Sequence, residues 1–317
     1  MMEHQKIQPR QGTTFVAMLE GQPLAIASLL TGIMAIACAA IFIKISTTEI
    51  GPIATISHRF WIAIVPLSLW AGVERLLRPS ETSSNPLAVD EWALLLLAGV
   101  IAAVDLPLWA FSLTRTSVAN AMVLSDLAPL FTTLGAWLLW RQRFDTRFLV
   151  GLAISLGGAV AIGFGDVQLD AQQAWGDGAA LLSALFLSVY LLTLERLRTR
   201  LSAPVILLST STIGALITGV IALVVEHQFF PISSQGWAAV IGLALVSQVL
   251  GQGLITYSLS RLSSGVVALS YLLEPVLSAL GAWILFSETL SLFNEVAFAL
   301  VILGVYIAIS SQSAVKD

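Results

Sequence analysis

The sequence predicts an all-α membrane protein in which ten transmembrane helices form two inverted five-helix repeats. Three observations support this fold class. Of the 317 residues, 57% are hydrophobic and only 11% are charged, the mean hydropathy is +0.90, and one half of the chain matches the other at a fixed offset. Because soluble domains are far less apolar, we expect most of the chain to lie in lipid.

Ten apolar segments of about 20 residues, the length that crosses a bilayer core, can be cut from the chain at charged or Gly/Pro-rich breaks. In the first half the expected spans are Leu24–Ile45, Pro52–Ala71, Trp92–Leu113, Thr116–Leu139 and Phe148–Gly165. In the second half they are Gly176–Leu194, Pro204–Val225, Gly236–Leu259, Ser264–Phe286 and Leu292–Ser310. The two repeats then occupy 24–165 and 176–311, and residues 1–23 and 312–317 form terminal tails.

Basic side chains predict the orientation, because Lys and Arg collect on the cytoplasmic side of a membrane. With the N-terminus inside, the outer loops contain only Arg115. The inner segments contain Lys6, Arg10, Arg75, Arg78, Arg141, Arg143, Arg147, Arg196, Arg198, Arg200, Arg261 and Lys316. The first apolar stretch is longer than the core of a signal peptide, so we interpret the N-terminal tail as uncleaved. We expect a multi-pass protein of the inner (plasma) membrane with both termini in the cytoplasm.

An internal repeat appears at an offset of 146 residues, which pairs the segment Ser112–Arg115 with Ser258–Arg261. Further matches pair Leu127, Pro129, Leu134, Gly135, Ala136, Trp137 and Leu139 with Leu273, Pro275, Leu280, Gly281, Ala282, Trp283 and Leu285. Each repeat has five helices, an odd number, so the second repeat enters the membrane from the opposite side. Many secondary carriers are inverted repeats of this kind, with the binding site near the midplane.

The two stretches Ala119–Gly163 and Gly265–Ile309 share one layout, in which a small-residue helix leads to a mid-helix proline, a short turn and a glycine-bearing final helix. In the second copy the turn is acidic and reads Phe286-Ser287-Glu288-Thr289-Leu290. These stretches resemble the drug/metabolite transporter superfamily, in particular its EamA-type branch. The first copy departs from that pattern, with Gln142 where the family usually has Glu. The resemblance implies a transporter built from two such repeats, and its motifs say little about the substrate.

Two carboxyl groups are expected near the midplane, where an ionisable side chain is costly and usually marks a pathway. Glu274 lies about 15 Å into its helix, and Asp126 lies at a similar depth. Glu274 shares a helical face with Ser270 and Ser278, with Tyr271 one turn back. A carboxyl group at this depth could exchange a proton and couple transport to a proton gradient. The alternative for both acids is a structural role, in which each bonds to a neighbouring helix.

Three further ionisable residues are expected at one depth near the outer surface. His58 and Arg59 lie about 10 Å below that surface on the second helix, and Asp105 lies near this depth on the third. We predict an Arg59–Asp105 contact, with Arg59 reaching up to the headgroups as the alternative. His58 is a pathway candidate whose plainer interpretation is a packed interior histidine.

A polar stripe of Gln248, Gln252 and Thr256 repeats every fourth residue on the eighth helix, where Gly251 and Gly253 permit local distortion. Pro107 interrupts the third helix near the matching position, and helices broken at corresponding places in two halves indicate a binding site. Aromatic surface for an organic solute would come from Trp109, Tyr190, Tyr257 and Tyr271. Packing within the bundle is the alternative for each of them.

Several classes of function are not supported by the sequence. It lacks a G-x-x-x-x-G-K-[S/T] loop for ATP and the HExxH and G-x-S-x-G motifs of hydrolases. Its only cysteine, Cys38, excludes an internal disulfide and a multi-cysteine metal site. The net charge of −4 comes without a basic stretch, which argues against nucleic acid. We therefore expect no enzyme activity, no cofactor and no metal.

The prediction that follows is a secondary transporter, an exporter of a small organic metabolite such as an amino acid, that works by alternating access. Its partners would be that solute and the lipid bilayer. Acids beside aromatics favour a solute with an amine, while Arg59 and Lys44 leave an anionic solute open. One rival is a non-transporting membrane scaffold or sensor. Another is an intramembrane lipid-modifying enzyme using Ser57 and His58, although adjacent helical residues point about 100° apart.

Overall fold

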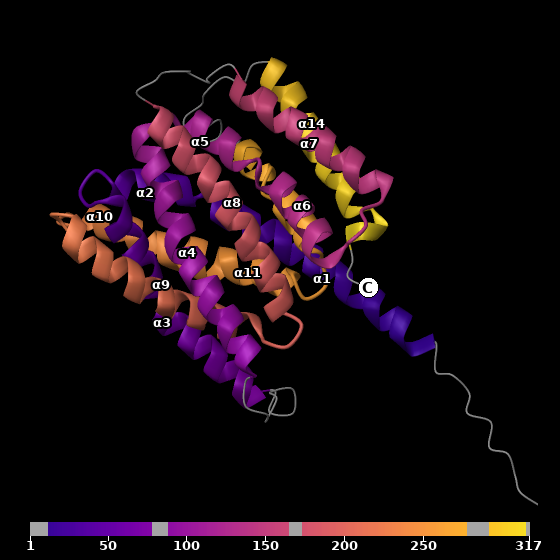
Figure 1. The fold of residues 1–317 in the computed structure, drawn as a ribbon, viewed down its shortest axis with the longest axis horizontal. Helices are drawn as coiled ribbons and strands as arrows, with labels where there is room; N and C mark the ends of the chain where they lie inside the picture. The colour runs from indigo at the N-terminus through magenta and orange to yellow at the C-terminus, as the bar shows by residue number, and fades with distance from the viewer. Residues whose placement is uncertain (1–11, 78–87, 165–172, 278–291, 315–317) are drawn as a thin grey trace, which may run out of the picture.

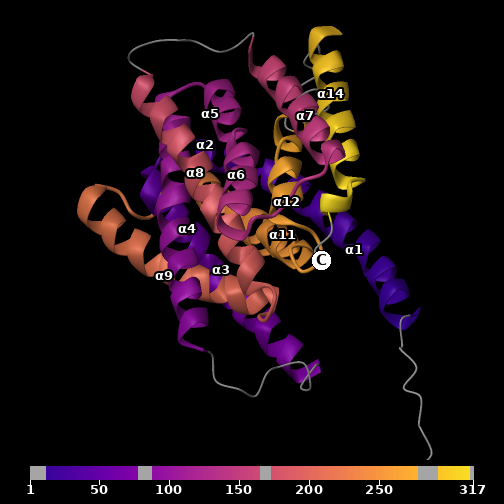
Figure 2. The same ribbon diagram turned by 45° about the vertical axis from the view of Figure 1, so that its right-hand side comes forward.

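The structure is a computed structural model that describes residues 12–77, 88–164, 173–277 and 292–314, and within these ranges every regular element is a helix. Helices satisfy their own backbone hydrogen bonds, which a segment surrounded by lipid must do. Figures 1 and 2 show the helices packed side by side in one bundle. The all-helical part of the predicted fold class is confirmed for the described residues.

The helices of the first half are α1 (Gly12–Ala37), α2 (Ala39–Ser46), α3 (Pro52–Leu77), α4 (Val89–Arg115), α5 (Val118–Ser125), α6 (Ala128–Trp140) and α7 (Thr146–Phe164). Those of the second half are α8 (Ala174–Leu197), α9 (Ala203–Val225), α10 (Ser234–Gly242), η1 (Leu243–Gln252), α11 (Gly253–Ser258), α12 (Ser264–Ser270), α14 (Leu292–Ile309) and η2 (Gln312–Ala314). Here η1 is a π-helix and η2 a single 3₁₀ turn. Residues 273–277 are helical as well.

Seven helical segments are long and apolar enough to cross a membrane. They are Gln22–Ser46, Pro52–Leu77, Val89–Arg115, Asn120–Trp140, Ala174–Leu197, Ala203–Val225 and Ser234–Ser258. These correspond to the first four expected spans and to the sixth, seventh and eighth. At the other three places the structure has the shorter apolar helices Thr146–Ala161, Ser264–Leu277 and Glu295–Ile309. The chain is a multi-pass membrane protein, and the number ten stays a prediction.

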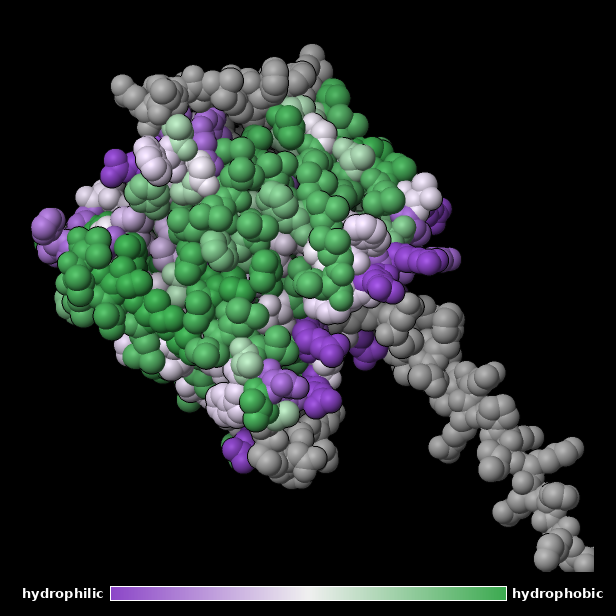
Figure 3. Space-filling model, in the orientation of Figure 1, coloured by the Kyte–Doolittle hydropathy of each residue, from purple (hydrophilic) through white to green (hydrophobic). Residues whose placement is uncertain are grey.

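Hydrophobic side chains cover the flank of the molecule seen in Figure 3, and hydrophilic ones gather toward its ends. Leu76 and Val224 leave 82% and 81% of their surface exposed, as suits side chains that face lipid rather than water. Within the bundle, buried side chains of both halves form one large apolar core that includes Leu29, Phe60, Phe148 and Leu191. The two halves therefore pack together as one unit.

The last long helices of the two halves, α7 and α14, pack against each other, and their contacts are related by an approximate two-fold axis. Ser155 Oγ donates to the Val301 carbonyl at 3.4 Å, and these residues are 146 positions apart, the offset of the repeat. The backbone of Gly151 approaches Gly304, and that of Gly158 approaches Ala297, so exchanging the halves converts one contact into the other. The numbering falls along one helix as it rises along the other, so the pair is antiparallel. Inverted repeats predict this packing.

The remaining helix contacts follow the same symmetry. α3 packs on its equivalent in the other half, α9. α6, the second part of the fourth expected span, packs on α12, the first part of the equivalent ninth span. α4 packs on α8, and α1 packs on η1 and α11. These contacts are equivalent, because α8 corresponds to the first span and the third span, α4, corresponds to the eighth span, which contains η1 and α11. Gly214 and Gly251 allow close approach at two of the interfaces, since a Cβ there would lie 2.7 Å from the Phe60 ring and from Ile36 respectively.

Two equivalent helices are broken in the middle. α5 ends at Ser125 and α6 begins after a turn at 126–127, while α12 ends at Ser270 and helix resumes after a turn at 271–272. Under the 146-residue offset the two breaks differ by one position. A proline follows each break, Pro129 and Pro275, and proline fits the first turn of a restarted helix because its missing N–H has no partner there.

The expected break in the third helix was wrong, because α4 continues through Pro107 without interruption. In the eighth helix the expected distortion is present as the π-helical turns of η1, between Gly242 and Gly253. A single proline removes one backbone hydrogen bond, which packing on both sides of α4 by α8 and α9 tolerates.

Helix also extends beyond two expected boundaries. α1 begins at Gly12, so part of the expected tail 1–23 is helical. α3 and α4 both reach into the expected inner loop 72–91, and its Pro- and Ser-rich part, 79–86, lies outside the described residues. The acidic turn Phe286–Leu290, the matched residues Leu280–Leu285 and the end of the ninth expected span also lie outside them.

Candidate functional site

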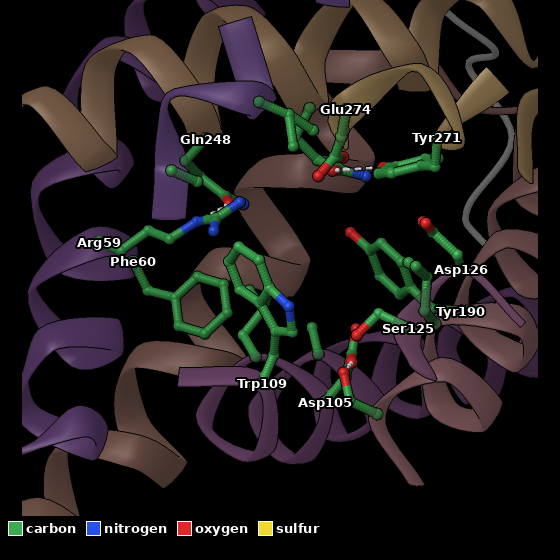
Figure 4. A pocket seen from close by; sticks show the side chains of 17 residues that line it. Arg59, Phe60, Asp105, Trp109, Ser125, Asp126, Tyr190, Gln248, Tyr271 and Glu274 are labelled. Atoms are coloured by element: carbon green, nitrogen blue, oxygen red, sulfur yellow. Dashed lines mark hydrogen bonds between the residues drawn. The ribbon is translucent and has the colours of Figure 1, made fainter. Parts of the chain in front are cut away.

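A cavity is lined by residues of both halves of the chain, and Figure 4 shows their side chains around it. Helices of both halves supply its walls, including α3, α4 and α8, the π-helix η1 and both broken helices. Its lining residues are Ile36, Ala39, Arg59, Phe60, Ala102, Asp105, Leu106, Trp109, Ser125, Asp126, Ser183, Leu187, Tyr190, Gln248, Gln252, Tyr271 and Glu274. This is the place where inverted-repeat carriers hold their solute.

The structure brings eight of the nine predicted pathway residues together around this cavity. They are Glu274, Asp126, Tyr271, Gln248, Gln252, Asp105, Trp109 and Arg59. Their role in transport stays a prediction, because the geometry shows only where they lie. The serines Ser125 and Ser183 also line the cavity and were not singled out by the sequence. A lone serine in an apolar helix is a weak signal, although Ser125 lies directly before Asp126.

Arg59 is held inside the bundle by the eighth helix. Its side chain is only 3% exposed, which excludes the alternative that it reaches up to the headgroups. Arg59 Nε donates to Gln248 Oε1 at 2.8 Å, and Gln248 Nε2 donates to Ser211 Oγ at 3.3 Å. A neutral amide oxygen therefore holds the guanidinium in place beside the cavity.

The predicted Arg59–Asp105 ion pair is not formed among the described residues. Asp105 instead accepts a hydrogen bond from Ser183 Oγ at 2.5 Å. The reason is the packing of α8 along α4, which places the serine hydroxyl beside the carboxylate, while η1 brings Gln248 to the arginine. Both charged groups still line the same cavity.

Four buried polar atoms of the cavity have no hydrogen-bond partner among the residues that the structure describes: Ser125 Oγ, Asp126 Oδ2, Gln252 Nε2 and Glu274 Oε1. A buried polar atom without a partner costs about 1–3 kcal/mol, so such groups are uncommon unless they serve a purpose. Asp126 lies in the first of the two equivalent helix breaks, and Glu274 lies two residues after the second, in the helix that resumes there. In Figure 4 both carboxyl groups point into the same space. The arrangement can bind a polar solute or take up protons.

Aromatic side chains form much of the remaining wall. Trp109 and Phe60 lie on one side, and the Tyr190 hydroxyl points toward the centre of the cavity (Figure 4). The Tyr271 hydroxyl donates to Gln252 Oε1 at 3.4 Å, which links the ninth expected span to the eighth. Tyr257, the remaining aromatic candidate, does not line the cavity.

His58 does not line the cavity. Its ring lies 4.8 Å from that of Phe229 and 5.7 Å from that of Trp237, measured between centroids. Its Nδ1 lies 2.9 Å from the Ala54 carbonyl oxygen one helical turn back. These contacts fit the packed interior histidine better than a pathway group.

Hydrogen bonds tie the halves together at the end of the bundle where α3 begins. Both carboxylate oxygens of Glu226 accept from the first turn of α3, from the N–H groups of Ile53 at 2.9 Å and Ala54 at 2.8 Å. Glu49 accepts from the N–H groups of Ile232 and Ser233 and from the Ser233 hydroxyl. The Ser233 hydroxyl and these N–H groups lower the pKa of Glu49 below its ordinary value.

A second set of ties lies at the opposite end. Asp145 accepts from the N–H groups of Phe148 at 3.0 Å and Gln312 at 3.1 Å, which joins the start of α7 to η2. Partial burial alone would raise the pKa of Asp145, but these hydrogen bonds and that from Ser313 lower it. Ser263 N–H also donates to the Ala314 carbonyl at 3.0 Å. Polar hydrogen bonds therefore join the two halves at these two places.

Comparison with known proteins adds a family relationship. The model of the EamA-like transporter family matches the chain twice, over residues 23–164 and 174–310. The chain is 25% identical over 279 residues to an uncharacterized transporter of Archaeoglobus fulgidus, covering 86% of this chain and 92% of that protein. It is 24% identical over 168 residues to an uncharacterized transporter of Helicobacter pylori, covering 50% and 53% respectively.

A solved crystal structure shares the fold. It superposes with a TM-score of 0.74 over 90% of this chain and 96% of the other, at 21% sequence identity. The double family match agrees with the internal repeat found at the 146-residue offset, because each match spans one half of the chain.

Proposed function

The chain belongs to the EamA-like transporter family, and from that premise we propose that it is a secondary transporter that exports a small organic metabolite, such as an amino acid, by alternating access. It is a membrane transporter by family. The proposal adds an inner membrane crossed ten times, both termini in the cytoplasm, and two inverted repeats that rock about the central cavity.

One observation carries the proposal: two carboxyl groups with an unpartnered oxygen, Asp126 and Glu274, face one cavity from the two equivalent broken helices. Structural acids in a membrane bundle would use their oxygens to bond neighbouring helices. Oxygens left without a partner at this depth fit groups that bind a solute or exchange protons with it. Proton coupling through these acids is part of the proposal.

The chemistry of the cavity suggests the kind of solute. Two acids beside Trp109 and Tyr190 favour an amine or another organic cation. The Arg59 guanidinium, which lines the same cavity, would attract a carboxylate, so a solute carrying both groups suits the cavity. Lys44 does not contribute, because its Nζ donates to the Leu113 carbonyl and it does not line the cavity.

The first test is a thermal-shift screen of purified, detergent-solubilised protein against amino acids, nucleosides, sugars and polyamines, because a bound ligand stabilises the fold by mass action. We expect at least one compound to raise the melting temperature. Glu274→Gln and Asp126→Asn should abolish that shift, while Glu295→Gln, which changes an exposed carboxylate on α14, should keep it.

Flux into proteoliposomes then separates a carrier from its rivals. A scaffold or sensor would keep its function when the buried acids are neutralised, whereas the carrier should lose flux in Glu274→Gln without loss of expression. A shift that survives in both acid variants would move the binding site elsewhere. The enzyme rival has little support, because His58 Nδ1 is engaged by Ala54 and Ser57 Oγ has no hydrogen-bond partner.

A further inference from the structure

A second hollow, separate from the central cavity, lies at the end of the bundle where α6 and α8 end and α7 begins. We call it the arginine basin. Its lining residues are Trp140, Arg141, Gln142, Arg143, Phe144, Asp145, Glu195, Arg196, Thr199, Gln312 and Ser313. It shares none of these residues with the cavity, and the proposed transport mechanism does not use it.

The basin carries three exposed arginines, Arg141, Arg143 and Arg196. None of them forms an ion pair within the described part of the chain, where the ion pair present joins Arg200 to Glu91. Two acids also line the basin: Asp145, whose carboxylate accepts from the N–H groups of Phe148 and Gln312, and the buried Glu195. Three exposed arginines against these two acids leave the hollow with an excess of positive charge.

The turn that follows α6 brings Arg141 and Arg143 to the edge of the basin. Arg141 adopts a left-handed conformation with φ of 53°, which ends α6 there, and the Gln142 N–H donates back to the Ala136 carbonyl at 3.3 Å. This is the usual way in which a chain reverses direction at the C-terminus of a helix. The turn places Arg141 and Arg143 in the lining of the basin, and the last turn of α8 contributes Arg196.

An apolar surface leads up to the same rim. Leu134, Trp137 and Leu138 on α6 are 54%, 56% and 68% exposed, and Trp140 at the rim is 40% exposed. Tryptophan is enriched where lipid tails meet headgroups. The basin thus joins a lipid-facing helix on one side to a charged hollow on the other.

We propose that the arginine basin binds the phosphate headgroup of an anionic phospholipid, with the acyl chains lying along the exposed face of α6. Guanidinium groups bind phosphate through two parallel N–H bonds, a geometry that a lysine cannot offer. Basic pockets between transmembrane helices on the cytoplasmic side recognise anionic headgroups in this way. The apolar face of α6 favours a lipid over a free phosphate.

The test measures phosphatidylglycerol and phosphatidylcholine binding to the full-length protein by native mass spectrometry. Each arginine near an anionic headgroup contributes about fivefold, so Arg143→Gln with Arg196→Gln should weaken phosphatidylglycerol binding about 30-fold. Arg143→Lys with Arg196→Lys should show an intermediate loss, because the charge stays while the paired N–H geometry is lost. The matched control, Arg75→Gln with Arg261→Gln, removes two exposed arginines outside the basin and should bind as the parent does.

Three results would overturn the proposal. Equal losses in the basin and control variants would mean that general positive charge attracts the lipid. If phosphatidylcholine bound as tightly as phosphatidylglycerol, the basin would not distinguish lipids by headgroup charge. Displacement of the lipid by millimolar inorganic phosphate would assign the basin to a free phosphate instead.

Discussion

Arg59 shows how single side chains organise the centre of the bundle. An uncompensated charge in a membrane interior is costly, and here the charge is bonded to the Gln248 amide, which is in turn bonded to Ser211. Asp105 is satisfied in a similar way by Ser183. These neutral partners leave both charged groups beside the cavity without cancelling them, so each remains available to a polar solute.

A prediction at this scale concerns Gln248. Replacing it with Leu removes the acceptor of a buried guanidinium, and hydrogen bonds to charged groups contribute roughly 1.5–3 kcal/mol. We expect Gln248→Leu to lower thermal stability by about that amount, measured by melting in detergent. Gln228→Leu, which changes an exposed glutamine, serves as the control. Equal stability of the Gln248 variant and the parent would show that Arg59 does not depend on this bond.

Among the helices, the informative feature is the pair of equivalent breaks at 126–127 and 271–272. A carboxyl group that lines the cavity lies in the first break, Asp126, or just after the second, Glu274, and each break is followed by a proline that favours a helix restart. The α7–α14 pair, in contrast, consists of two unbroken helices that pack closely through glycines. Such a pair suits a rigid element about which the two halves could rotate.

A prediction at the element scale tests that packing with neighbouring glycines. A Cβ on Gly158 would lie 2.8 Å from Val301 Cγ2 and 2.9 Å from the Ala297 oxygen, whereas a Cβ on Gly157 would meet nothing within 4 Å. Overpacking of this kind costs about 1–3 kcal/mol. Gly158→Ala should therefore lower the melting temperature, and Gly157→Ala should leave it unchanged or raise it slightly, because Ala favours helix more than Gly. Equal effects of the two changes would contradict the close contact.

For the whole molecule, the proposed alternating access would require polar contacts between helices to open at one end of the bundle. Glu49 and Glu226 join the halves where α3 begins, and Asp145 joins the start of α7 to η2. All three are carboxylates that accept from backbone N–H groups, so each tie depends on a charged oxygen rather than on apolar contact. Polar ties of this kind can be exchanged for bonds to water when the end opens.

The Glu49 tie should depend on pH. Its hydrogen bonds lower the pKa of Glu49 below 4.5, so the tie is fully present above that ordinary value and is lost as the pH falls through the lowered one. We expect the Ile232 and Ser233 amides to lose hydrogen-exchange protection on acidification, after correction for intrinsic rates. Glu49→Gln should already show the loss at pH 7, whereas Glu91→Gln should not. Full protection in Glu49→Gln would rule out a role for the charge.

Sequence reasoning succeeded where the physical cause is local along the chain. The length of each apolar run determined most of the helices, because a segment in lipid must satisfy its own backbone hydrogen bonds. The duplication, visible as the 146-residue offset, predicted two inverted repeats, and the two-fold packing of α7 on α14 agrees with it. Depth, which follows from the rise per residue, singled out Glu274, Asp126, Arg59 and Asp105. The sequence placed these four at two different depths, and the structure brings all of them to one cavity.

Tertiary structure decided which groups meet. Asp105 bonds to Ser183, 78 positions away, and Arg59 to Gln248, 189 positions away. His58 faces away from the cavity although it adjoins Arg59. Depth alone could not determine these outcomes, because the rotation of each helix about its axis selects the neighbours of its side chains, and that rotation is set by packing against helices remote in sequence. The sequence itself therefore determined the length of the spans and the depth of each residue within them. The hydrogen-bond partners of the buried charged residues were decided only by the packing of the helices.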